Sequence, residues 1–576
     1  MLIQVIGETR RIFFLTTVVA LGAVVIATRL FYLQVAMGSH YYNLADTQYT
    51  AGGQYSLYER GSIYFSNKDG GQIGAAGLES GFILAINPSL IVEGNEVIYE
   101  KLLSIIPGIS KEQFLIRAEK NTDPYEEIAH RLTLQQKNKI EELDIKGIIL
   151  VKEQWRTYPA DNLASQVIGF VGFNEDEFVG RYGIEREYES VLSRSTNGLY
   201  NNFFTGILDG VKKDFFGEER DRDGDVILTI EPKVQALVES KLEELISNWT
   251  PRKVGIMVID PKTGEIMAMA ARPSFDPNNL KDETDPEVFS NPFVEDVFEM
   301  GSIMKPITIA SALDAGVIKS STTYLDKGFI ELDGKRISNF DGKGRGLASM
   351  QDVLNQSLNT GATFAALSLG PNRFREYMYR FGYQDKTGID LPQETGNLIE
   401  NLESNKEVEI ATASFGQGIA VSPISITRAL SALGNGGYLI KPHVTRSIDY
   451  TLGYSDGIKV TDQGRAISRE ASDEITRMLV KVVDEYLANG GLKMEHYSIA
   501  AKTGTAQIAN PDGGGYYTDR YTHSFFGYFP AYNPRFLIFL FMTEPVGANY
   551  ASQTLTEPFR DITKFLISYY DIPPDR

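Results

Sequence analysis

Residues 254–271, VGIMVID-PKTG-EIMAMAA, hold two apolar runs on either side of a Pro-Lys-Thr-Gly turn. Two such runs joined by a short turn with Pro and Gly predict a β-hairpin. The segment before it, EPKVQALVESKLEELISNW (231–249), spaces its apolar residues as an amphipathic helix does and has Pro232 at its start. A helix followed by antiparallel strands predicts an α+β domain in which the helix packs on the sheet.

The length and the charge of the chain limit what it can be. With 576 residues it exceeds the size at which a single core usually stops growing, so we expect two or three domains. Its 56 basic and 75 acidic residues give a net charge of −19. Phosphate binding needs a basic surface, so this balance argues against nucleic acid as the partner.

The chain contains no cysteine, which excludes disulfides, Cys-ligated zinc and thiol catalysis together. Its five histidines stand at positions 40, 130, 443, 496 and 523, with no HExxH pattern and no closely spaced pair. A His-rich metal site is therefore not expected. Any nucleophile has to depend on a base other than histidine.

The N-terminal segment predicts a membrane anchor. Residues 12–28, IFFLTTVVALGAVVIAT, carry no charge, and the apolar character continues to residue 36. The uncharged run is short for about 30 Å of hydrocarbon, but Arg29 can extend it by snorkelling. We predict a transmembrane helix at 12–36 and a cytoplasmic tail at 1–11, because Arg10 and Arg11 precede the run. The alternative is a cleaved signal peptide, although no clean small-x-small cleavage site follows.

The rest of the chain divides at a charged, turn-rich stretch, FFGEERDRDGD (215–225). Before it, residues 40–220 contain short strand-like runs broken by Gly, Asn and Asp, and one expected helix at 132–143. This part has no dense cluster of catalytic residue types, so we interpret it as a scaffold. The expected second domain is 225–576.

The first candidate for chemistry is EMGSIMKP (299–306), in which Ser302 and Lys305 are three positions apart. On a helix these side chains share one face. A serine becomes a nucleophile when a base takes its proton, and a lysine can do so if burial keeps it neutral. The alternative for this pair alone is a solvated helix surface, since Ser-x-x-Lys is expected by chance every few hundred residues.

Two further motifs follow. Ser357-Leu358-Asn359 could offer a proton relay and a hydrogen bond to a substrate, or could be a helix-capping turn. Lys502-Thr503-Gly504-Thr505 lies in the strand-like stretch YSIAAKTGTAQIA. There Gly504 would let a substrate backbone lie close, while the lysine and threonines could hold a carboxylate. The alternative for this stretch is a hairpin turn, which is our interpretation of the similar PKTG at 261–264.

The order Ser-x-x-Lys, Ser-x-Asn, Lys-Thr-Gly is the signature set of penicillin-binding proteins and class A β-lactamases. The chain resembles the class B penicillin-binding proteins, monofunctional peptidoglycan D,D-transpeptidases, over nearly its whole length. The N-terminal half contributes RLFYLQVA (29–36), ERGSIY (59–64), RTYPADNLASQVIGFVG (156–172) and GIEREYESVL (183–192) to the resemblance. The C-terminal half contributes DGDVILTIEPKVQ (223–235), VIDPKTGEIMAMAARPSFDPN (258–278), SFGQGIAVSPISI (414–426), GNGGYLIKPHV (434–444) and SFFGYFPAYNPRFLI (524–538).

The resemblance implies a fold. The single transmembrane helix would be followed by an elongated mixed α/β pedestal of the dimerisation type at 40–220. A transpeptidase domain at 225–576 would come next, and it would be an α+β domain built on an antiparallel sheet with helices on both sides. It also implies a place in the bacterial cytoplasmic membrane, with the N-terminus inside and the catalytic domain outside.

The resemblance also implies roles for the motif residues. Ser302 would attack the carbonyl of the penultimate D-Ala of a stem peptide, with Lys305 as its base. Ser357 would pass the proton to the leaving amine, and Asn359 would hold the donor peptide. The carboxylate of that peptide would be bound by the Lys-Thr-Gly-Thr stretch, through Lys502, Thr503, Gly504 and Thr505.

The expected oxyanion hole consists of the backbone N–H groups of Ser302 and Thr505. No cofactor and no metal is implied. The chain departs from the family pattern at three places: Met300 replaces a usual Pro, Phe65-Ser66 replace Asp-Arg, and Tyr532 replaces a frequent Asp. Met300 could alter the start of the nucleophile helix and hence the acylation rate.

The expected ligands are stem peptides and β-lactams. The expected partners are a SEDS-family glycosyltransferase and other division or elongation proteins. The pedestal's lack of long insertions favours the division type. Two alternatives remain: a D,D-carboxypeptidase or β-lactamase-like hydrolase, and a catalytically weak scaffold of wall synthesis. A bifunctional class A protein is rejected, because residues 40–220 show no convincing pair of catalytic acids.

Overall fold

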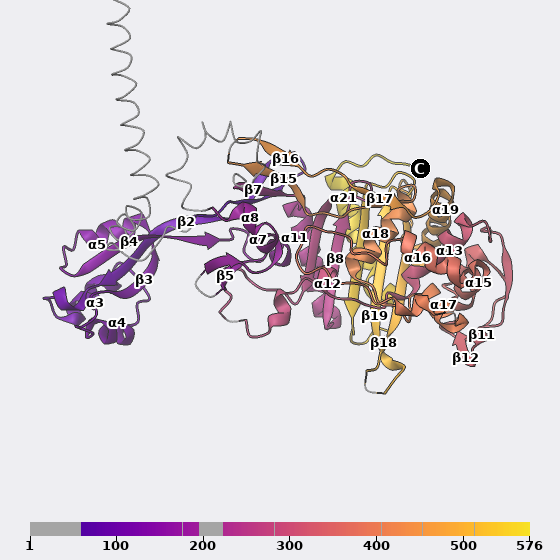
Figure 1. The fold of residues 1–576 in the computed structure, drawn as a ribbon, viewed down its shortest axis with the longest axis horizontal. Coiled ribbons are helices and arrows are strands. Elements are labelled where there is room, and N and C mark those ends of the chain that lie inside the picture. Colours follow the sequence, from indigo (N-terminus) through magenta and orange to yellow (C-terminus); the bar gives the residue numbers. More distant parts are fainter. Residues whose placement is uncertain are drawn as a thin grey trace, which may run out of the picture. The chain divides into compact units, whose positions relative to one another are not determined.

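The computed structural model describes residues 59–174, 177–194 and 223–576, apart from positions 282, 405, 452 and 512. These residues form two compact units (Figure 1). The predicted tail 1–11 and anchor 12–36 lie outside the described residues, as does most of the segment 215–225. Within the described ranges, no helix is long and apolar enough to cross a bilayer.

The first unit comprises residues 79–155 together with Glu59. Strand β2 (Gln72–Ile86) pairs in its second half with the antiparallel β3 (Glu126–Leu132), and also pairs with β4 (Ile148–Thr157). Three helices complete a small core with these strands: α3 (Asn95–Leu103), α4 (Lys111–Ala118) and α5 (Leu134–Glu141). The helix expected at 132–143 is thus confirmed as α5, which begins at a capping box made by Thr133 and Gln136.

The second unit comprises residues 60–78 and the described residues from 156 to 576. Residues 60–78 and 156–194 therefore pack with the C-terminal part of the chain. The predicted domains, 40–220 and 225–576, stay a prediction. Its centre is a five-stranded antiparallel sheet in the order β18-β19-β20-β8-β9. The strands are β8 (Lys253–Ile259), β9 (Ile266–Arg272), β18 (Ala500–Ala509), β19 (Tyr516–Phe529) and β20 (Phe536–Thr543).

The predicted hairpin at 254–271 is confirmed as β8 and β9, with Met257 opposite Met269. The Pro-Lys-Thr-Gly turn joins them, and Gly264 has φ +81 there, a conformation that favours glycine. The predicted helix at 231–249 is α11 (Pro232–Trp249), whose first turn is capped by the Glu231 carboxylate accepting from Val234 N–H.

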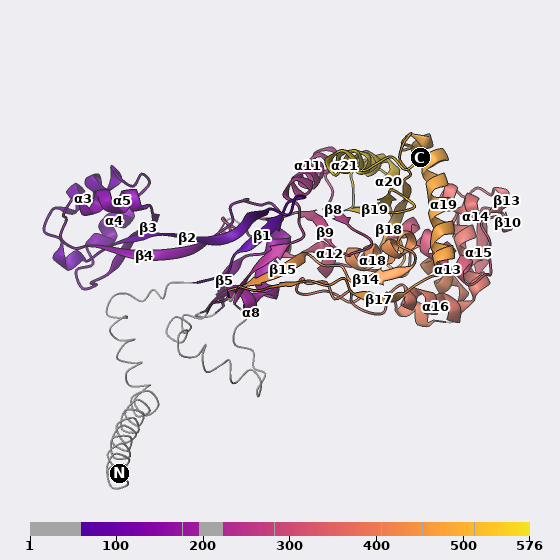
Figure 2. The same ribbon diagram turned by 90° about the horizontal axis from the view of Figure 1, so that it is seen from above.

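Helices cover both faces of the sheet (Figure 2). α11 and α21 (Thr556–Tyr569) contact each other and lie on one face. On the other side, α18 (Pro423–Gly434) contacts β20, and α19 (Arg469–Glu485) contacts the edge strand β18. Behind α19 lie α13 (Lys305–Asp314), α14 (Met350–Asn355) and α15 (Asn359–Leu369). The sheet edge at β18 therefore meets a helical layer that carries the first two motifs.

The departure at Phe65-Ser66 is accommodated within a second, seven-stranded sheet. Strand β1 (Ile63–Ser66) pairs in parallel with β7 (Gly224–Leu228). The Phe65 ring is fully buried, and the Ser66 hydroxyl donates to the carbonyl of Leu228 at 2.7 Å. Phe65 and Ser66 thus contribute to the buried interior at this point of the chain. Tyr532, the third departure, is exposed.

Candidate active site

The Ser-x-x-Lys motif forms a short 3-10 turn, Gly301–Met304, that runs directly into α13 at Lys305. In a 3-10 turn residues three apart lie above one another, so Ser302 and Lys305 share a side as predicted. Gly301 has φ +63, and its N–H donates to the carbonyl of Gly416 at 3.0 Å. Its neighbours in the turn are buried, whereas Ser302 is partly exposed. The serine is thus the residue of this turn that a substrate can reach.

Lys305 is completely buried, and its amine points to Ser357. Its Nζ donates to the Ser357 carbonyl at 2.5 Å and lies 3.1 Å from Ser357 Oγ. Burial, with a contribution from the charge of Lys502, holds the pKa of Lys305 well below its usual range. The lowered pKa favours the neutral form of the amine, the state in which it can accept a proton.

Lys502 reaches the same serine from the edge strand β18. Its Nζ donates to Ser357 Oγ at 3.2 Å and to the carbonyl of Thr503 at 2.9 Å. Burial lowers the pKa of Lys502 to about 8, so this amine remains mostly protonated at neutral pH. Two lysines from distant parts of the chain thus meet at one hydroxyl, and the pKa of Lys305 is lowered both by burial and by the charge of Lys502.

Ser357 lies between α14 and α15 and has φ +54, a left-handed conformation that is unfavourable for a residue other than glycine. Such backbone conformations persist only where the surrounding structure enforces them, and they cluster at functional sites. Here the conformation is held by the contact of its carbonyl with Lys305. The alternative, a turn in which this motif caps a helix, is not seen: α15 follows Leu358 with no side-chain cap, and Ser357 Oγ lies within hydrogen-bonding distance of both lysines.

Asn359, the third residue of the Ser-x-Asn motif, is the first residue of α15. Its amide donates to the carbonyl of Ser338 at 2.9 Å. The next residue, Thr360, bonds through its backbone N–H to Asn339 and through its hydroxyl to the buried carboxylate of Asp326. Sequence reasoning missed Asp326 and Asn339, because nothing in the sequence connects them to a motif 20 or more residues away.

Gly504 packs tightly against other parts of the chain. A Cβ at this position would lie 2.3 Å from Ser524 Oγ, 2.7 Å from the carbonyl oxygen of Met300 and 3.1 Å from Ile303. Glycine is thus required because the Gly301–Met304 turn and the residue before it pack against β18. Whether a substrate also lies along this strand stays a prediction. Thr505 accepts a hydrogen bond at Oγ1 from Ala551 N–H at 3.1 Å and is partly exposed.

Met300 is buried at the start of the nucleophile turn. Its carbonyl accepts a hydrogen bond from Ser524 Oγ at 2.7 Å, and its φ of −89° is not far from that of a proline. The turn therefore keeps an ordinary helical conformation with methionine in place of the usual proline. The side chain adds to the core beneath Ser302.

Not all predicted residues are brought into contact. In the described part of the chain, no hydrogen bond joins Ser302 Oγ to Lys305 or Ser357. In unliganded enzymes such bonds often form only in the substrate complex. What the structure does bring together is a partly exposed hydroxyl, a buried amine of lowered pKa on the same side of its turn, a second hydroxyl and a cation. These are the groups that acyl transfer to a serine requires.

Two family models match the chain. The penicillin binding protein transpeptidase domain matches residues 254–564, and the penicillin-binding protein dimerisation domain matches residues 58–201. Stage V sporulation protein D of Bacillus subtilis is 30% identical over 95% of this chain and 84% of its own length. Peptidoglycan D,D-transpeptidase FtsI of Escherichia coli K12 is 27% identical over 76% of this chain and 71% of its own length.

Solved structures show the same fold. Penicillin binding protein 2X from Streptococcus thermophilus superposes with a TM-score of 0.73 at 20% identity, covering 88% of this chain and 79% of its own. Penicillin binding protein 3 from Mycobacterium tuberculosis, in complex with aztreonam, gives a TM-score of 0.66 at 20% identity, covering 90% of this chain and 98% of its own.

Proposed function

Since this chain belongs to the class B penicillin-binding proteins, we propose that it is a serine D,D-transpeptidase that cross-links peptidoglycan stem peptides through an acyl-enzyme on Ser302. The observation that carries this proposal is the convergence of Lys305 and Lys502, 3.1 and 3.2 Å from the same Ser357 hydroxyl, beside the nucleophile turn. β-Lactams inhibit the enzyme by acylating the same serine.

The two lysines divide the chemistry by their charge. Neutral Lys305 accepts the proton of the Ser302 hydroxyl as the oxygen attacks the carbonyl carbon of the penultimate D-Ala. The peptide C–N bond then breaks, and a proton passes through Ser357 Oγ to the nitrogen of the departing D-Ala. Cationic Lys502 binds the substrate carboxylate with Thr503 and Thr505. An amine of a neighbouring stem peptide finally attacks the ester and releases Ser302.

The negative oxygen of the tetrahedral intermediate needs donors, and we assign them to the backbone N–H groups of Ser302 and Thr505. Support comes from how closely the two segments approach. A Cβ at Gly301 would lie 2.7 Å from the carbonyl oxygen of Thr505, so the backbones of the turn and of β18 are in contact there. Asn359 is assigned to the donor peptide, which it would bind by exchanging its bond to Ser338.

The products of the reaction distinguish this function from a D,D-carboxypeptidase. Given lipid-linked glycan strands, the full chain is expected to form cross-linked dimers, because an amine rather than water resolves the acyl-enzyme. Chromatography of the digested product measures this, and penicillin-treated enzyme is the control. Shortened monomers without dimers would reject the transpeptidase in favour of a hydrolase, and no product at all would favour the scaffold.

We further propose that residues 12–36 anchor the enzyme in the cytoplasmic membrane, with the catalytic unit outside, and that it works with a SEDS-family glycosyltransferase, preferentially in division. The uncharged run at 12–28 and the preceding Arg10 and Arg11 support the anchor. Co-purification from detergent is expected to depend on residues 12–36 and to be unaffected by Ser302→Ala. Equal recovery of the partner with a chain lacking 12–36 would reject this.

A further inference from the structure

Glu299 lies three residues before Ser302 and connects three segments of the second unit. Its Oε1 accepts hydrogen bonds from the N–H of Gly418 at 2.9 Å and from the hydroxyl of Tyr516 at 3.0 Å. The other carboxylate oxygen, Oε2, is buried, and no group in the described residues donates to it. Both donors thus depend on a single oxygen atom.

The first of these bonds holds the loop that supports the nucleophile turn. Gly416 of this loop accepts the N–H of Gly301 at 3.0 Å, and further along Val421 forms a pair of backbone hydrogen bonds with Phe298, both at 3.0 Å. Contact at the glycines is tight, because a Cβ at Gly416 would lie 2.3 Å from the carbonyl oxygen of Gly301. The position of the loop therefore determines the position of Gly301, and with it the N–H of Ser302.

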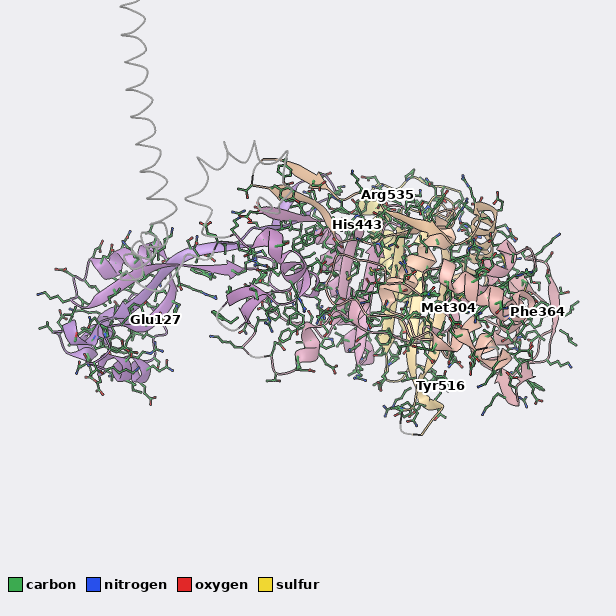
Figure 3. The ribbon with its side chains drawn as sticks, viewed as in Figure 1. Glu127, Met304, Phe364, His443, Tyr516 and Arg535 are labelled. Atoms are coloured by element: carbon green, nitrogen blue, oxygen red, sulfur yellow. The ribbon has the colours of Figure 1, made fainter. Side chains whose placement is uncertain are left out.

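The second bond holds the hairpin that carries the Lys-Thr-Gly-Thr motif. Tyr516 is the first residue of β19 and pairs with Ala509 at the end of β18 (Figure 3). At the other end of the contact, Gly504 and Thr505 of β18 pack against Met300 and Gly301. The bond from Tyr516 to Glu299 thus adds a second attachment between the strand and the segment leading into the nucleophile turn.

We propose that Glu299 is a positioning residue that sets the placement of Ser302 relative to β18, and through it the rate of acylation, by means of its acceptor oxygen and not of its charge. This inference rests on the proposed function. The charge is not needed because a proton on Oε2 would leave Oε1 free to accept both bonds. Burial raises the pKa of this carboxyl, in keeping with a site that does not require the ionised form.

Three variants of the full chain in detergent test the proposal: Glu299→Ala, Glu299→Gln and Tyr516→Phe. The measurement is acylation by a fluorescent penicillin, separated into limiting rate and half-saturating concentration, with the thermal midpoint recorded in parallel. Since misplacing a reacting group by about 1 Å can cost on the order of 100-fold, we expect Glu299→Ala to lower the limiting rate roughly 10- to 100-fold. The half-saturating concentration should change little.

Glutamine keeps the acceptor oxygen, so the limiting rate of Glu299→Gln is expected to stay within about threefold of the wild-type rate. The limiting rate of Tyr516→Phe is expected to lie between those of Glu299→Ala and Glu299→Gln. Tyr517→Phe on the same hairpin is the matched control and should behave as wild type. A Gln variant as slow as the Ala variant would overturn the proposal, since the charge would then be essential. So would wild-type rates in both Glu299→Ala and Tyr516→Phe. Failure of the wild-type chain to be acylated would instead reject the proposed function.

Discussion

The Ser302→Ala variant of the full chain is expected to form no covalent adduct with a fluorescent penicillin, whereas the wild-type chain is labelled on the peptide that contains Ser302. Without the hydroxyl no ester can form, and loss of a serine nucleophile costs on the order of 10⁴- to 10⁶-fold in acyl transfer. Gel fluorescence followed by mass spectrometry of the modified peptide measures the effect. Label that persists in Ser302→Ala would assign the nucleophile to another residue.

The matched control is Ser311→Ala, on the helix that follows the nucleophile turn. The Ser311 hydroxyl is buried and donates to the carbonyl of Ile307 at 2.8 Å, one helical turn earlier. This bond lies within α13, so its loss should leave labelling at the wild-type rate. Because Ser302 is partly exposed and its hydroxyl has no hydrogen-bond partner among the described residues, Ser302→Ala should leave the thermal midpoint unchanged. The midpoint thus distinguishes a folded variant that has lost its nucleophile from a variant that is unlabelled because it is unfolded.

The second large effect is expected at Lys305. Replacing it by methionine removes the base while filling a similar apolar volume, and loss of a general base costs roughly 10²- to 10⁴-fold in rate. Lys305→Arg should be equally slow, because a guanidinium is not deprotonated in a protein and so cannot accept the serine proton. Stopped-flow acylation by penicillin measures both. An active Lys305→Arg variant would show that the charge of Lys305, and not its basicity, matters.

The pH dependence of acylation follows from the same pair of amines. The rate constant should rise as the pH increases through the low pKa of Lys305, because the base must be neutral. It should fall again above a pH of about 8, because Lys502 then loses the proton with which it binds the carboxylate. In Lys502→Arg the cation no longer titrates in this range, so the alkaline decrease is expected to disappear even if the absolute rate is lower. A decrease that persists in this variant would belong to another group.

Much of the fold could be predicted from local pattern. The hairpin at 254–271 and the helix at 231–249 were recognisable because apolar spacing and turn chemistry act over neighbouring residues, and both are present as β8, β9 and α11. The three motifs were likewise recognisable by residue type and order. Asp326 and Asn339 could not be recognised in this way. Their hydrogen bonds to Thr360 of α15 join parts of the chain that no sequence pattern connects.

Glu299 and Gly504 show the same limit at the site itself. Glu299 was visible only as the first letter of EMGSIMKP, because its partners Gly418 and Tyr516 are 119 and 217 residues away. For Gly504 the sequence predicted contact with a substrate, but it does not show which part of the chain itself approaches the glycine. The structure shows that it is the nucleophile turn, through Met300 and Ile303.

By itself the sequence determined the class of fold and the three motifs, and it led to the proposal of Ser302 as nucleophile, since these depend on which residue types stand at short, fixed spacings. The tertiary structure alone decided the states of the two lysines. The Nζ atoms of Lys305 and Lys502 approach one hydroxyl, Ser357 Oγ, from residues 52 and 145 positions away. Burial lowers the pKa of both amines, and the charge of Lys502 lowers that of Lys305 further. These effects exist only once the chain has folded.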